Sequence, residues 1–256
     1  MTPDQEPMAS KPLTAHLVEL RRRLLWSFAA MIVGTIICYL NVKPIYGFLV
    51  APLAQAMGPE STGRLIYTGL TEAFFTYMKV AFFAGIFLTF PILAMQLWKF
   101  VAPGLYKNEK RAFLPYLVAT PLLFFMGGAF VYYIVLPMAW PFFLSFQSGS
   151  AETVLPVQLE ARVGEYLDLV MLLIFAFGLC FQMPVVLTLL GRAGIITAYM
   201  MKKFRRYAIV VIFVIAAIIT PPDVISQISL AIPMMALYEL SIFLVRKVSP
   251  DARNTE

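Results

Sequence analysis

Two glutamates of this sequence each lie among basic residues, beside long apolar segments. Glu19 belongs to the run TAHLVELRRR, and Glu109 belongs to the run FVAPGLYKNEKRAF. A carboxylate accepts two parallel hydrogen bonds from an arginine guanidinium, so two such acids suit a cationic ligand. The second interpretation is a local helix salt bridge, in which Glu19 pairs with Arg22 or Arg23. Glu109 would pair with nearby lysines in the same way, and the spacing alone favours these local pairs.

Little else in the sequence suits catalysis. His16 is the one histidine, so neither an HExxH metal pair nor a Ser–His pair at membrane depth is present. No Gly-rich phosphate loop follows a strand pattern. Cys38 and Cys180 lie inside apolar runs, where a free cysteine behaves as a small hydrophobic residue. Two isolated cysteines build neither a disulfide framework nor a metal site. We therefore expect no enzyme, no metal and no cofactor.

The composition is that of a membrane protein. Of the 256 residues, 61% are hydrophobic and 13% are charged, against roughly 45–50% and ~25% in soluble domains. The net charge of +6 does not indicate nucleic-acid binding, because the basic residues lie beside apolar segments instead of on one soluble face. Runs this long and apolar predict transmembrane helices. We expect one all-α membrane domain over 1–256 with six spans, approximately 24–40, 73–98, 114–136, 166–190, 207–219 and 224–245.

The positions of the basic residues predict the orientation. Of the 20 Lys and Arg residues, 16 fall in segments assigned to one side, and only Lys43, Arg64 and Arg162 fall on the other. Lys79 lies within the second span. Because positive residues concentrate on the cytoplasmic side of membrane proteins, both termini and the polar hinge 100–113 are predicted in the cytoplasm.

Prolines and span lengths predict the shape. Prolines fall in spans two, three, four and six, and helices bent this often favour a curved wall over a straight bundle. The fifth span reaches only about 20 Å, short of the roughly 30 Å hydrocarbon core. The apolar stretch 45–53, which contains Pro52, is too short to cross a membrane. We expect it to rest as a cap on the outer face.

Charged and polar side chains at membrane depth are often functional, although each one here also has a simpler structural interpretation. We expect Lys79 to extend outward toward acids such as Glu72. Glu239 either extends inward or accepts a bond from a partner helix. Gln182 precedes Pro184, so it either satisfies backbone groups freed by the proline or contacts a group that enters the bilayer.

A polar cluster surrounds the Pro-Pro turn that follows the short fifth span. It consists of Thr220, Asp223 and Gln227. In the simpler interpretation Asp223 caps the next helix. The alternative is a docking point for another polar helix.

Five motifs give the chain a resemblance to the TatC family, the multi-spanning receptor component of the twin-arginine protein translocase. The motifs are HLVELRRR at 16–23, APL at 51–53, APGLYKNEKR at 102–111, FQMPV at 181–185 and TPPDVISQ at 220–227. They occur in the family's order, with six predicted spans. The resemblance covers roughly residues 13–247.

The resemblance implies a receptor that binds the twin-arginine signal peptides of folded proteins. Glu19 and Glu109 would bind the signal arginines. The other expected signal-peptide contacts are His16, Arg21, Leu105, Tyr106 and Lys107.

The resemblance also implies partners and an energy source. The receptor would assemble with single-span TatA and TatB proteins into an oligomeric complex, among the lipids of a prokaryotic inner membrane. Thr220, Asp223 and Gln227 would receive the partner helices. The proton-motive force would supply the energy, so no nucleotide is expected. The family often has a glutamate where this chain has Gln182, so a mechanism that titrates this position is not expected here.

Two other functions stay open. A small-solute secondary transporter would explain Lys79, Glu239 and the bent helices, although the internal repeat of many carriers is missing. A passive membrane scaffold would need neither Glu19 nor Glu109.

Overall fold

The structure, a computed structural model, describes residues 13–58, 64–105, 110–148, 157, 159–220 and 224–248. Within these ranges the chain is almost entirely helical, and its β contacts are two isolated bridges. The predicted all-α fold is confirmed. The helices are α1 (Leu13–Leu40), α2 (Val42–Met57), α3 (Glu72–Leu105), α4 (Lys110–Phe130), η1 (Val131–Val135), α5 (Leu136–Leu144), α6 (Val163–Cys180), α7 (Met183–Arg192), α8 (Ala198–Ile219) and α9 (Val224–Val248).

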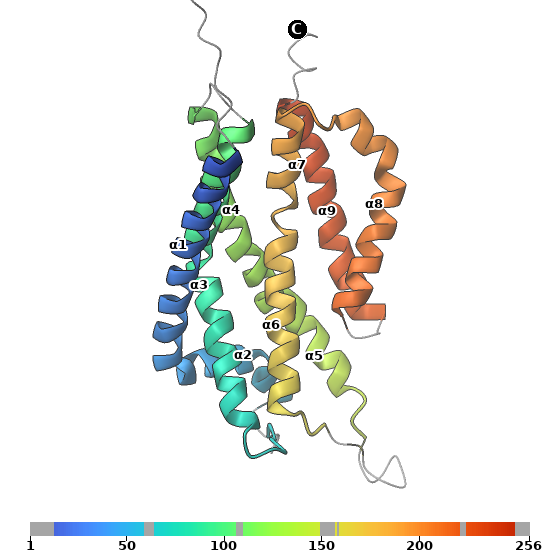
Figure 1. The fold of residues 1–256 in the computed structure, drawn as a ribbon. Helices are drawn as coiled ribbons and strands as arrows, with labels where there is room; N and C mark the ends of the chain where they lie inside the picture. The colour runs from blue at the N-terminus through green and yellow to red at the C-terminus, as the bar shows by residue number, and fades with distance from the viewer. Residues whose placement is uncertain are drawn as a thin grey trace, which may run out of the picture.

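The long helices lie side by side, as Figure 1 shows, with α1 and α3 at one edge and α8 and α9 at the other. Helices α6 and α7 stand between these two edges. The start of α1 and the end of α9 lie at the same end of the molecule, which we name the basic end because Arg21, Arg22, Arg246 and Lys247 lie there. The opposite end, crossed by α2, is named the cap end.

Among the described residues, five stretches are long and apolar enough to cross a membrane. They are Leu17–Leu40, Glu72–Phe100, Leu114–Leu144, Val163–Arg192 and Gln227–Val248. The fifth predicted span, 207–219, lies in α8, and its crossing of the membrane stays a prediction, as does the cytoplasmic side of the basic end.

Helix α8 begins earlier than predicted. The predicted span 207–219 forms only part of α8, a 22-residue helix that begins at Ala198. The hydroxyl of Thr197 accepts a hydrogen bond from the Met200 amide at 3.2 Å, which caps this start. At 1.5 Å per residue the helix is about 33 Å long. Its basic first turns therefore extend a short apolar segment within one continuous helix.

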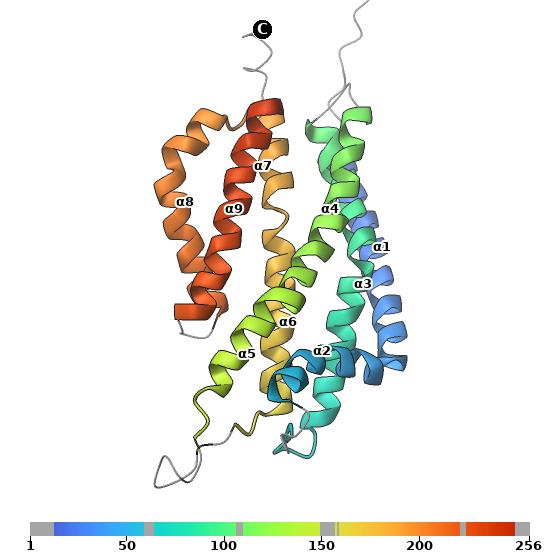
Figure 2. The ribbon, with the colours of Figure 1, turned by 180° about the vertical axis from the view of Figure 1, so that it is seen from behind.

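Two spans carry irregular turns. The third continues from α4 through the π-helical turn η1 into α5, and Figure 2 shows this run crossing obliquely past α6. π-Helical turns are a known cause of helix bending. In the fourth span, α6 ends at Cys180 and α7 begins at Met183, one residue before Pro184. Proline has no amide to bond the Cys180 carbonyl, so the interruption predicted at this proline is observed.

Glycines set the closest helix contacts. A Cβ added to Gly85 of α3 would lie 2.6 Å from the Thr35 amide nitrogen of α1. A Cβ added to Gly127 of α4 would lie 2.6 Å from the Phe177 carbonyl oxygen of α6. Small residues let transmembrane helices approach this closely. Side chains of α6, among them Leu167 and Phe177, are fully buried in the largest apolar core.

The cap helix α2 is held by two tyrosines. Pro52, buried in α2, has no amide, so the Phe48 carbonyl one turn earlier loses its helical donor. The Tyr132 hydroxyl donates to that carbonyl at 2.9 Å, and the Tyr166 hydroxyl donates to the neighbouring Leu49 carbonyl at 3.0 Å. The stretch predicted as a short cap is thus a tied 16-residue helix.

Candidate functional site

The predicted acid of α1 lies beside α3 at the basic end. Arg23, one turn after Glu19, donates to the Glu19 carboxylate from Nε at 3.1 Å and also from a terminal guanidinium nitrogen. The other terminal nitrogen of Arg23 donates to Gln96 Oε1 of α3 at 3.5 Å. The local salt bridge, one of the two sequence interpretations, is therefore present. It also shows that the Glu19 carboxylate accepts a guanidinium.

The remaining predicted signal-peptide contacts are placed only in part. Glu109, Tyr106 and Lys107 lie outside the described residues. Leu105 is the last residue of α3, and His16 lies in the first turns of α1. Because α1 and α3 run side by side, both residues lie at the basic end, as Glu19 does.

Arg21 points away from Glu19. Together with Arg22 it lines a shallow groove on the exposed side of α1, next to Trp26. Glu19 and Arg23, four residues apart, occupy the side of α1 that meets Gln96 of α3. The structure therefore brings Glu19 and Gln96 together and leaves Arg21 on another face.

The predicted partner-helix cluster lies where α8 turns into α9. The Thr220 hydroxyl is buried and donates to the Ala216 carbonyl at 2.8 Å, which ends α8. Gln227 of α9 donates from Nε2 to the Phe213 carbonyl of α8 at 3.2 Å. Both side chains therefore tie α8 to its turn and to α9. Asp223 lies outside the described residues.

Two charged side chains at membrane depth have partners that the sequence did not reveal. Lys79 of α3 contacts both carboxylate oxygens of Asp168 of α6, at 3.0 and 2.7 Å. The acid named as an example, Glu72, is therefore the wrong partner, although Asp168 is also an acid near the cap end, in the first turns of α6. Glu239 of α9 pairs with Arg205 of α8 at 2.7 Å, so it accepts a bond from another helix, one of its two predicted alternatives.

Gln182 lies in the break between α6 and α7. Its side-chain amide donates to the Gly178 carbonyl at 3.4 Å and to the Thr120 carbonyl of α4 at 3.0 Å. The Gln182 backbone amide bonds Leu179 instead of Gly178, so the Gly178 carbonyl is a group freed by the break. The simpler interpretation of Gln182, satisfying such groups, agrees with these bonds.

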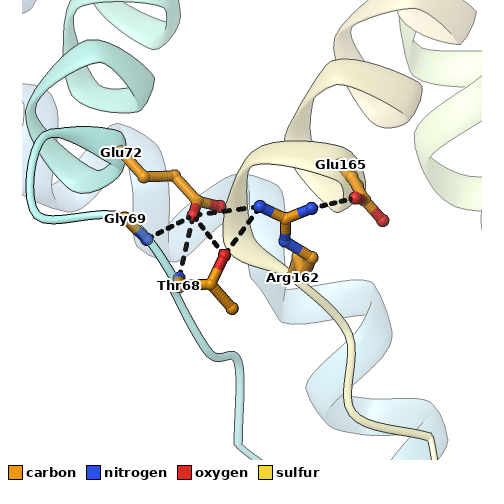
Figure 3. A network of polar contacts seen from close by, with 5 residues as sticks. All are labelled: Thr68, Gly69, Glu72, Arg162 and Glu165. Carbon is orange, nitrogen blue, oxygen red and sulfur yellow. Dashed lines mark hydrogen bonds and ion pairs between the residues drawn. The ribbon is translucent and has the colours of Figure 1, made fainter.

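A polar network at the cap end was missed by the sequence analysis (Figure 3). Glu72, the first residue of α3, accepts hydrogen bonds from the Thr68 amide at 2.9 Å and the Gly69 amide at 3.2 Å. Arg162 reaches Glu72 at 3.4 Å and Glu165 at 2.8 Å, and it donates to the Thr68 hydroxyl at 2.7 Å. An acid at a helix start is a visible signal, as are an arginine and an acid three residues apart. The contact between Arg162 and Glu72, which are 90 residues apart, cannot be seen in the sequence.

The chain is similar to known proteins of one family. The family model described as "Sec-independent protein translocase protein (TatC)" matches residues 15–233. A protein of that name from Magnetococcus marinus is 51% identical over 93% of this chain and 84% of its own length. One from Escherichia coli is 38% identical over 96% of this chain and 93% of its own length.

A solved structure agrees with these sequence matches. A crystal structure titled "Twin Arginine Translocase Receptor- TatC" superposes with a TM-score of 0.78 at 40% sequence identity, over 91% of this chain and 99% of that chain. The sequence similarity and the fold similarity each cover nearly the whole of the described chain. This multi-pass membrane protein belongs to the TatC family of Sec-independent protein translocase components.

Proposed function

We propose that this chain is the signal-peptide receptor subunit of a twin-arginine translocase, in the inner membrane of a prokaryote, with both termini in the cytoplasm. It would bind paired arginines of folded cargo proteins at the basic end, through Glu19 and Glu109. No chemical step is assigned to the chain, and the proton-motive force would drive the transport.

The observation that carries this proposal is the guanidinium already bound at Glu19. Arg23 donates to that carboxylate from two nitrogens, and its third nitrogen donates to Gln96. An incoming arginine of the same chemistry can replace Arg23 with little net change in charge pairing. Glu109 would take the second arginine, from the segment that follows α3.

The partners are proposed to be TatA- and TatB-type single-span proteins, docked along α8. Tyr207, Val210, Val214 and Ile218 of α8 are exposed in the single chain. Gln227 of the neighbouring helix α9 is half-buried and donates to the Phe213 carbonyl of α8 at 3.2 Å. An apolar helix face with a polar residue at its end suits a partner helix that carries one polar group. Several receptor subunits would gather with these partners in one complex.

A solute transporter is less well supported. The transporter hypothesis was based on the presence of Lys79 and Glu239 at membrane depth. These side chains are neutralised by Asp168 and Arg205 of the same chain, so neither supplies an uncompensated charge for a solute.

Photo-crosslinking tests the receptor. A peptide with paired arginines and a photo-reactive group should label the 100–113 segment of the full chain in membrane vesicles. We expect Glu19→Ala and Glu109→Ala each to weaken this labelling, and the double variant to abolish it. A peptide with paired lysines should label less, because an ammonium does not form the two parallel bonds of a guanidinium.

The control is Glu160→Ala, an exposed acid at the cap end, which should leave labelling unchanged. Undiminished labelling in both single variants would contradict the proposed binding of the signal arginines by Glu19 and Glu109. Solute uptake by the purified chain alone in vesicles would favour the transporter instead.

A further inference from the structure

An apolar cavity of about 570 Å³ lies beneath the cap helix. Helix α2 contributes Ile45, Phe48 and Leu49 to its wall, and the facing walls include Ala84 of α3 and Ala129 of α4. Figure 2 shows α2 running across this face at the cap end of α3 and α6. The volume lies within the range of roughly 300–1,000 Å³ that is usual for sites that bind small molecules.

The described wall offers nothing for a charged or polar ligand. No Asp, Glu, Lys or Arg lines the cavity among the residues that the structure describes. Asn41 donates to the Ile37 carbonyl at 3.0 Å, and Tyr132 donates to the Phe48 carbonyl at 2.9 Å, so these two polar groups already have partners. The hydroxyl of a third lining residue, Tyr133, belongs to a largely exposed side chain. A trapped water needs roughly two to four polar partners, which this wall lacks. An uncharged hydrocarbon is the ligand that the wall complements.

A flexible hydrocarbon tail fits this cavity better than a helix does. A transmembrane helix is ~10 Å wide with its side chains, and a rigid cylinder of that width suits a long groove more than a cavity of about 570 Å³. A hydrocarbon tail is thinner and flexible, and it needs no backbone hydrogen bonds within the cavity. The cavity is also reached from the bilayer, since its wall residues Ile37 and Ala84 belong to the candidate spans Leu17–Leu40 and Glu72–Phe100.

We propose that this cavity holds an acyl chain of a membrane phospholipid. The tail lies between α1 and α4, passes beneath α2 and ends toward the middle of the span of α3. It fills space beside the half-exposed ring of Phe48, which would otherwise lack partner atoms on that side. The position of the cap helix therefore depends on a lipid as well as on the bonds from Tyr132 and Tyr166. This assignment does not rest on the proposed receptor function.

The test uses the full chain in phosphatidylcholine vesicles that contain a phospholipid with a diazirine near the end of one acyl chain. After irradiation, peptide mass mapping locates the attached lipid. We expect strong labelling of 83–88 and 125–133, two of the segments that line the cavity. Labelling of the exposed face of α8 should be weaker, because lipids exchange freely there.

Two variants fill the cavity from opposite walls. Ala84→Phe and Ala129→Phe should each lose the labelling of both cavity segments, while the unfolding temperature of each variant in detergent reports whether it folds. The matched control is Ala217→Phe on the exposed side of α8, which should keep the labelling. Native mass spectrometry gives a second readout: the parent chain should retain one phospholipid after a detergent wash, and the folded filled variants should not.

Three results would overturn the proposal. Equal labelling of the cavity and of α8 would mean ordinary contact with the bilayer. Unchanged labelling in both folded, filled variants would place the lipid tail elsewhere. Labelling by a photo-reactive apolar helical peptide, in place of the lipid, would assign the cavity to a protein partner.

Discussion

The two ends of this molecule are held together in different ways. At the cap end, hydrogen bonds join segments far apart in the chain: Arg162 to Thr68, and Tyr166 to the Leu49 carbonyl. At the basic end, the Glu19–Arg23 pair lies within one helix turn, and Gln96 extends it to α3 at 3.5 Å. In the middle, α1 and α3 meet through glycine.

This difference suits the cap end to stability and the Glu19 carboxylate to the exchange of one guanidinium for another. Bonds that cross between segments fix the cap end in one arrangement. A salt bridge within one helix turn costs little to replace, which suits a carboxylate that has to release one guanidinium and take another. On the α1–α3 side, the basic end therefore depends on helix packing for its shape and keeps Glu19 available for a ligand, whereas Arg205 and Glu239 join α8 to α9 on the other side.

The largest effect is expected where α1 and α3 meet. Gly85→Leu would place side-chain atoms against the Thr35 backbone, where a Cβ alone lies 2.6 Å from the amide nitrogen. Overpacking of this kind costs about 1–3 kcal/mol, and here it displaces α1 and with it Glu19. We expect a lower unfolding temperature in detergent and a loss of signal-peptide crosslinking.

Gly47→Leu is the matched control, because nothing lies within 4 Å of a Cβ at this helical glycine. Amide exchange in the cap-end network should be unchanged in both variants. If Gly85→Leu leaves peptide crosslinking intact, the basic end does not depend on the α1–α3 contact.

The next largest effect is expected in the cap-end network. Glu72→Ala removes the acceptor for the Thr68 and Gly69 amides and a partner of Arg162. Hydrogen exchange of these two amides should become faster, and so should that of Ile66 and Val163, which bond the facing segment. Peptide crosslinking at the basic end should not change.

Glu165→Ala removes only the outer partner of Arg162, so it should leave the Thr68 and Gly69 amides protected. Equal exchange in the two variants would show that Glu72 does not organise the network.

Local patterns in the sequence were sufficient for part of this architecture. Long apolar runs predicted the all-α membrane fold, and Pro184 predicted the interruption of the fourth span, because both signals act within a few residues. The early start of α8 was missed because its basic first turns resemble a hinge, although Thr197 marks a cap. Gly85 likewise gave no sign of its partner on α1.

The contacts between distant side chains could not be predicted in this way. Lys79 and Asp168 are separated by 89 residues, and no period or spacing links them. Glu72 was predicted as a partner of Lys79 because it was the nearest acid on the same helix face. In the structure, Glu72 is occupied by backbone amides and Arg162. For Glu19, the local pair was foreseeable, because the four-residue spacing of a helix salt bridge is a local rule.

A smaller effect is expected at the tie between Tyr132 and the cap helix. Tyr132→Phe leaves the Phe48 carbonyl without its donor and should cost about 1 kcal/mol of unfolding free energy. In a Pro52→Ala background the new backbone amide can bond the same carbonyl, so the same Tyr132→Phe change should cost less. A double-mutant cycle measured by denaturant unfolding isolates this coupling. Tyr133→Phe, on the exposed neighbouring tyrosine, is the control, and an equal cost of Tyr132→Phe in both backgrounds would contradict the explanation.

The smallest effect, and the most direct test of exchange at the basic end, is expected from Arg23→Gln. If Arg23 and a signal arginine compete for the Glu19 carboxylate, removing Arg23 should strengthen peptide binding by about 0.3–1 kcal/mol, roughly two- to fivefold, since the pair is partly exposed. Titrated crosslinking measures this change. Arg22→Gln removes the same charge from the exposed side of α1, so it corrects for the general loss of repulsion toward a cationic peptide. Equal gains in the two variants would mean that only net charge matters, and weaker binding in Arg23→Gln would mean that Arg23 positions Glu19 instead of competing for it.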